Sequence, residues 1–174
     1  MRKSLIAAGA AAAVLTAPAV ASAHVTVNPR EAPAGGFTVL NVRVPNERDD
    51  KGTVKVELRL PAGFYFLSYK KVPGWRTTLT RERLDRPVDL GGFSVSEQFT
   101  RVVWKGNRKK GGIIRPDQFE EFPISVRMPN GNPGDQLVFP AIQTYRGGER
   151  VAWTGGPDAD EPAPRVTLGP AEAE

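Results

Sequence analysis

One histidine, His24, has a position in this 174-residue chain that could support metal chemistry. It directly follows Ala21-Ser22-Ala23, a triplet of small residues of the kind after which signal peptidases cut. Cleavage there would make His24 the first residue and turn its backbone nitrogen into a free α-amine. The amine and the imidazole Nδ1 could then bind one metal ion together in a six-membered chelate ring. Nitrogen donors of this kind suit Cu(II), although the donors by themselves do not separate copper from nickel or zinc.

The residues before His24 have the organisation of a secretory signal peptide. Arg2 and Lys3 give a basic start, residues 5–17 form an apolar run without a charge, and Pro18 ends the run. The run has about 13 residues, against the ~20 that cross a bilayer, which favours a cleaved leader over a membrane anchor. We therefore expect residues 1–23 to be a signal peptide and the mature chain to be extracytoplasmic: secreted, at the cell surface or periplasmic.

A carboxylate is the natural third ligand, because the chain has no second histidine. Glu31 lies seven residues after His24, and a turn that includes Pro29 could return its carboxylate to the amino terminus. Two other interpretations stay open. A glutamate is more often a solvated surface residue, and a terminal histidine is often exposed without a ligand.

Composition and motifs exclude several kinds of active site. The chain has no cysteine, which removes thiol nucleophiles, Cys-ligated zinc, iron–sulfur clusters and blue-copper thiolates. It has no phosphate-binding G-x-x-x-x-G-K-[ST] motif, and a histidine at the mature terminus cannot sit between the partners of a catalytic triad. Copper enzymes that cleave polysaccharides use a brace with a second histidine. We therefore expect a binding protein and not an enzyme.

Short runs of alternating apolar and polar residues recur along the mature chain, separated by glycine and proline. They lie at residues 38–45, 53–61, 93–104, 121–129 and 135–153. Such runs are typical of antiparallel strands with one buried face, and several of them indicate an all-β sandwich.

The domain organisation follows from these runs. We expect one β-sandwich domain over residues 24–168 and a short C-terminal tail at residues 169–174. Trp75 and Trp104 are expected to pack in the core. Trp153, which follows a Gly-Gly turn, could either pack in the core or flank a metal centre.

The charge of the mature chain is mild. Arg2 and Lys3 account for two units of the formal net charge of +5, which leaves +3 and no strong attraction to nucleic acid. No apolar run after residue 23 is long enough to span a membrane, so we expect a soluble mature chain. The basic, glycine-rich loop at residues 105–115 supports an alternative function, metal-independent binding to the cell wall or another polyanion. A basic loop of this kind is more often a solvated hairpin tip.

Several short motifs occur in a characteristic order. They are HVTVNP at 24–29, VPNE at 44–47, VPGW at 72–75, VVWKG at 102–106, PDQFEEFPISVRMP at 116–129, FPAIQTY at 139–145, VAWTG at 151–155 and PAPRV at 162–166. Together they cover nearly the whole mature chain and resemble the YcnI-like (DUF1775) family of copper-binding domains.

The resemblance implies an exported bacterial protein with a cupredoxin-like β-sandwich and a role in copper trafficking or homeostasis, with copper-transport or copper-chaperone membrane partners. It also implies that Cu(II) is bound through the mature N-terminal histidine, a mono-histidine brace. His24 matches the bracing histidine, and Glu31 matches the acidic position shortly after it. Trp153 matches the tryptophan near the site. Glu121 is a competing carboxylate.

The first prediction concerns the amino terminus. Because the small residues at 21–23 form a cleavage site, the exported protein should begin with His24. Intact-mass and N-terminal peptide mass spectrometry of the exported protein check this. A different first residue would contradict the predicted chelate.

Overall fold

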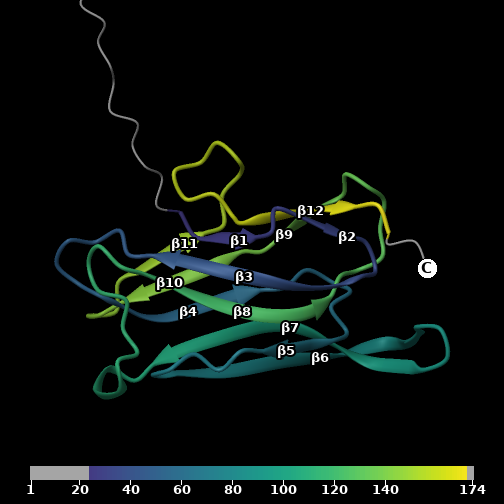
Figure 1. Ribbon diagram of the computed structural model, residues 1–174, viewed down its shortest axis with the longest axis horizontal. Helices are drawn as coiled ribbons and strands as arrows, with labels where there is room; N and C mark the ends of the chain where they lie inside the picture. Colours follow the sequence, from purple (N-terminus) through teal and green to yellow (C-terminus); the bar gives the residue numbers. More distant parts are fainter. Residues whose placement is uncertain (1–23, 172–174) are drawn as a thin grey trace, which may run out of the picture.

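The computed structural model of the chain describes residues 24–171 (Figure 1). The predicted signal peptide, the predicted cleavage bond and residues 172–174 lie outside the described residues. The strands are β1 (Thr26–Asn28), β2 (Glu31–Pro33), β3 (Phe37–Pro45), β4 (Thr53–Arg59), β5 (Leu67–Tyr69), β6 (Trp75–Asp89), β7 (Ser94–Gly106), β8 (Phe119–Arg127), β9 (Gln136–Val138), β10 (Ala141–Tyr145), β11 (Arg150–Trp153) and β12 (Arg165–Gly169). A single-turn 3₁₀ helix, η1 (Arg108–Lys110), follows β7.

Two sheets form the sandwich. One has the strand order β1-β3-β8-β5, and the other has the order β11-β10-β4-β7-β6. A third, small sheet has the order β2-β12-β9 and lies at one side of the sandwich (Figure 1). The predicted all-β, antiparallel sandwich is confirmed, with one local exception. β12 pairs with β2 in parallel. β2 follows β1 along the chain but belongs to the small sheet, where the C-terminal strand β12 lies beside it.

The alternating runs form the strands that the sequence predicted. Leu40, Val42 and Val44 of β3 are fully buried, and so are Phe122 and the other inward residues of β8. Residues between them point outward, as the period of two requires. Each apolar face covers the other, so one core joins both sheets.

Aromatic contacts connect the two sheets across this core. Phe122 of β8 stacks on Trp104 of β7 with ring centroids 4.9 Å apart, and it meets Trp75 edge-on at 5.0 Å. Trp104 is fully buried and Trp75 nearly so. The packing roles predicted for these two tryptophans are therefore confirmed.

Two features of the fold differ from the sequence-based expectation. β6 had no clear apolar alternation, because beyond the sandwich it forms with β7 a ribbon whose two faces are largely exposed (Figure 1). Residues 135–153 form three strands and not two, since Pro140 lacks the N–H that a continuous strand would need. The turn at Gly147 and Gly148 is present, and both have the positive φ, 94° and 92°, that glycine adopts without strain.

Within residues 24–171, no helix is long and apolar enough to cross a membrane.

Candidate metal centre

His24 lies where the edges of the two large sheets meet. It precedes β1, an edge strand of one sheet, and Trp153 ends β11, an edge strand of the other. The two rings are in contact, with centroids 5.4 Å apart and planes inclined by 53°. His24 is half-buried and Trp153 is fully buried. The structure thus brings together two residues that the sequence analysis selected, 129 positions apart.

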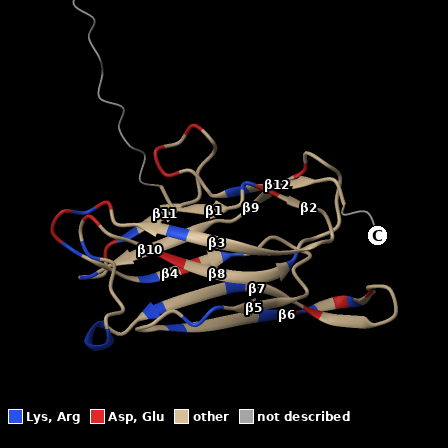
Figure 2. Ribbon diagram, in the orientation of Figure 1, with Lys and Arg blue, Asp and Glu red and all other residues tan. Residues whose placement is uncertain are grey.

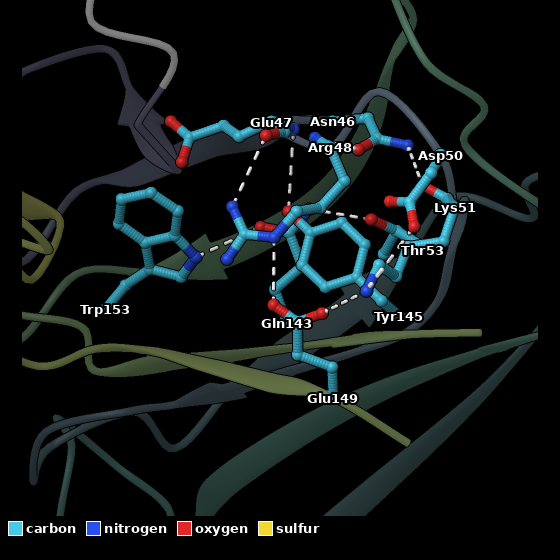
Figure 3. Close-up of polar contacts among 10 residues, drawn as sticks. All are labelled: Asn46, Glu47, Arg48, Asp50, Lys51, Thr53, Gln143, Tyr145, Glu149 and Trp153. Carbon is cyan, nitrogen blue, oxygen red and sulfur yellow. Dashed lines mark hydrogen bonds and ion pairs between the residues drawn. The ribbon is translucent and has the colours of Figure 1, made fainter. Parts of the chain in front are cut away.

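Hydrogen bonds fix the indole ring of Trp153. Its Nε1–H donates to Oε1 of Gln143 at 3.1 Å (Figure 3). The Gln143 amide nitrogen in turn donates to the Pro45 carbonyl at 2.8 Å and to Oγ1 of Thr53 at 2.7 Å. Gln143 and Thr53 are completely buried. Since buried polar groups are costly when unpaired, this network holds the ring that faces His24 in one position.

The β3–β4 loop, residues 46–52, brings a carboxylate to the same place. Asn46 shapes the loop, because its side chain donates to the carbonyls of Lys51 and Ile114, at 2.9 Å each, and accepts the Arg48 N–H at 2.8 Å. The last contact is an Asx turn. The next residue, Glu47, donates its N–H to the Tyr145 hydroxyl at 3.5 Å. Figure 3 shows the Glu47 side chain extending on the side of the cluster where the Trp153 ring lies.

Ion pairs attach this loop to the β10–β11 turn. Glu149 accepts a hydrogen bond from Arg48 at 2.9 Å and pairs with Lys51 at 2.7 Å. Hydrogen bonds from Lys51 and Arg48 lower the pKa of Glu149. Exposed pairs of this kind are individually weak, but two of them on one carboxylate restrict the loop that carries Glu47.

The electrostatic surroundings connect Glu47 with His24. Burial raises the pKa of Glu47, the nearby His24 and Arg48 charges lower it, and the Glu161 charge raises it. Glu161 belongs to the loop between β11 and β12, which carries acidic side chains and stands beside the start of β1 (Figure 2). The carboxylate of Glu47 therefore lies within electrostatic range of both His24 and Glu161.

Glu31 and Glu121 lie in other places. After Pro29 the chain does not turn back toward His24 but crosses to the small sheet, so Glu31 starts β2 at the far end of β1 (Figure 1). Its carboxylate lies against Gly169, where an added Cβ would be 2.9 Å from Oε1. Glu121 is exposed on β8, opposite Arg43 of β3. The metal-binding roles of both residues remain predictions.

The side chains alone do not complete a metal site. Within residues 24–171, no three His, Asp or Glu side chains lie close enough to hold an ion. His24 and Glu47 supply one imidazole and one carboxylate. A third donor would have to come from another group, and the backbone nitrogen of His24 would become such a donor after cleavage.

Glu47 was not among the predicted site residues, although it ends the VPNE motif. No periodicity marks a loop residue, and Glu47 lies 23 positions from His24. The proximity of Glu47 and His24 follows from the antiparallel pairing of β1 with β3, in which Thr26 is opposite Arg43. This register places the residues before β1 beside the residues after β3.

Comparison with known families identifies the chain. The profile described as "Domain of unknown function (DUF1775)" matches residues 24–168. The chain belongs to the DUF1775 family. A relative, the copper-binding protein CutI of Bacillus subtilis strain 168, is 33% identical over 147 residues, which cover 84% of this chain. The match spans 62% of the length of CutI.

Two solved structures resemble this DUF1775 chain. A protein from Nocardia farcinica with an immunoglobulin-like fold is 31% identical, has a TM-score of 0.69, and is matched over 85% of this chain and 99% of its own. A cohesin module of a Clostridium perfringens family 33 glycoside hydrolase has a TM-score of 0.52 at 10% identity, over 86% of this chain and 97% of the module. The second likeness shows the fold alone. Both confirm the predicted β-sandwich.

The hydrogen-bond network generates a prediction for Gln143→Leu. This change replaces the buried amide with an apolar side chain and removes the hydrogen-bond partner of the Trp153 N–H, the Pro45 carbonyl and the Thr53 hydroxyl. Each buried group left unpaired costs about 1–3 kcal/mol, so we expect a clear loss in the free energy of unfolding. Urea denaturation measures the loss, and near-ultraviolet circular dichroism follows the Trp153 environment.

Gln136→Leu is the matched control. Gln136 is an exposed residue of β9, and its replacement should change the free energy of unfolding by less than about 0.5 kcal/mol. Equal stability losses in the two variants would contradict the role assigned to Gln143.

Proposed function

We propose that this protein is exported and binds Cu(II) through His24 as its mature N-terminal residue. The observation that carries the proposal is the contact of the His24 ring with the fixed Trp153 ring, beside the carboxylate of Glu47. The copper-binding relative CutI supports copper as the ion. Binding, and not catalysis, is the proposed activity.

The proposed donor set has three groups from two residues. Cleavage after Ala23 frees the α-amine of His24, which forms a chelate ring together with the imidazole Nδ1. An α-amine has an ordinary pKa of about 7.7–8.0, so the metal displaces a proton when it binds. The Glu47 carboxylate supplies an anionic oxygen, and mixed nitrogen and oxygen ligands suit the square geometry of Cu(II).

We propose Glu47 as the carboxylate ligand, in place of the Glu31 that the sequence predicted. Glu47 is held by the rigid β3–β4 loop and shares its electrostatic surroundings with His24. Glu31 lies beside Gly169 on the small sheet, and Glu121 lies opposite Arg43 on the outer face of β8. The buried Trp153 ring would form an apolar wall that limits water at one side of the ion.

The donor types also suggest how copper would leave. Soft sulfur ligands favour Cu(I), and the only sulfur after the leader is Met128, which is buried in the core. Reduction should therefore weaken binding. This property would suit transfer of copper to a copper-transport or copper-chaperone partner at the membrane, in copper trafficking or homeostasis.

Substitutions at His24 and at the three carboxylates test the ligand assignment. We expect His24→Ala to abolish high-affinity Cu(II) binding. Loss of a group that only supports a metal ligand typically weakens metal affinity by about 10–100-fold. Glu47→Gln should weaken Cu(II) affinity by more than this, because it removes a direct ligand. Competition titration of the mature protein with a copper chelator measures both effects.

Glu31→Gln and Glu121→Gln are matched controls that remove the same charge. Both variants should keep the wild-type affinity within about twofold, since their carboxylates lie elsewhere. A large loss in Glu31→Gln together with an unchanged Glu47→Gln would restore the original prediction and contradict this ligand set. Circular dichroism should show that all four variants are folded.

A further inference from the structure

Like charges lie directly opposite one another on the outer face of the five-stranded sheet. Arg76 of β6 is opposite Lys105 of β7, and Lys105 is opposite Lys55 of β4. Neighbouring strands are about 4.7–4.9 Å apart, and like charges directly opposite destabilise a sheet. This row therefore costs the fold some stability, and packing does not explain it.

The helix η1 adds three more cations beside this row. Arg108, Lys109 and Lys110 follow β7 directly (Figure 2). Asn107 fixes their backbone, because its side chain accepts the Lys109 N–H at 3.1 Å and its own N–H donates to the Gly74 carbonyl at 2.8 Å. The cations are thus mounted on an ordered turn.

Three adjoining hollows lie along this end of the molecule, with volumes of about 420, 540 and 640 Å³. They share lining residues: Lys105 and Arg108 border the first two, and Arg76 borders the first and third. Lys71 and Arg146 join the six cations named above, and no carboxylate lines any of the three. We call this surface the basic end.

The charge of the basic end is mostly unneutralised. Of its eight cations, Lys55 alone forms an ion pair within residues 24–171, with Glu57 at 2.9 Å. Glu57 also lies 3.9 Å from Arg101 and 3.7 Å from Arg150, so its single charge is shared. A surface with several free cations on a fixed scaffold raises the local concentration of polyanions.

We propose that the basic end binds a linear, phosphate-bearing polyanion, independently of copper. The hollows are shallow, adjoining and spread over four strands (β4, β6, β7 and β10) and η1, which fits an extended polymer better than a single small anion. The large apolar side chains exposed in residues 24–171 line none of the hollows, which favours a charged polymer over a lipid bilayer as the ligand. His24, Glu47 and Trp153 do not line them either.

Binding of long-chain inorganic polyphosphate tests the proposal. The copper-free mature protein is titrated into labelled polyphosphate, and fluorescence anisotropy is recorded at several salt concentrations. The double variant Arg76→Gln/Lys105→Gln should bind polyphosphate at least about tenfold more weakly. Its slope of log affinity against log salt should be smaller by about two, one for each cation removed. The thermal unfolding midpoint of this double variant should stay equal or rise, because the opposed charges are gone.

Arg83→Gln with Arg86→Gln is the matched control. It removes the same charge from the exposed part of β6, away from the hollows, and should leave affinity within about twofold. His24→Ala should also bind polyphosphate normally, which separates this proposal from copper binding.

Three outcomes would overturn the proposal. They are equal losses in the two double variants, no binding at low salt, and binding to anionic phosphatidylglycerol vesicles or duplex DNA without binding to polyphosphate.

Discussion

The pairing of β1 with β3 determines where the amino terminus lies, and the candidate site depends on it. Thr26 is opposite Arg43, so the residue that starts the described chain lies next to the loop that follows β3. A shift of one residue would move Val25 and Val27 out of the core, and their burial fixes the register. The site is thus built from one edge of each sheet. His24 comes from the first, Trp153 from the second, and Glu47 from the loop that connects them.

Much of the fold followed from the sequence, because period-two runs with one buried face specify strands locally. The residues Leu40, Val42 and Val44 and the inward face of β8 lie where the pattern placed them. β6 was missed because an exposed ribbon needs no apolar alternation. In the site, His24 and Trp153 were selected by residue type and family resemblance. Glu47 was missed because its proximity arises from strand register, which no local pattern reports.

Charge divides the molecule into two regions with different chemistry. Around His24, Glu47 and the acidic loop that contains Glu161 favour a cation. On the outer face of the five-stranded sheet, Arg76, Lys105 and the η1 residues favour an anion. The formal net charge of the whole chain, +5, does not reveal this division. The groups proposed to bind copper and the cations of the basic end are different side chains, so each set can be substituted without changing the other.

The central claim is that the free α-amine of His24 is a metal ligand. The most direct measurement is the electron spin resonance spectrum of Cu(II) bound to the mature protein, compared with a variant that retains Ala23 before His24. Every side chain is present in both. If the α-amine binds the metal, the added residue should weaken binding strongly and remove the signal of the nitrogen pair. Identical spectra and affinities for the two proteins would contradict it.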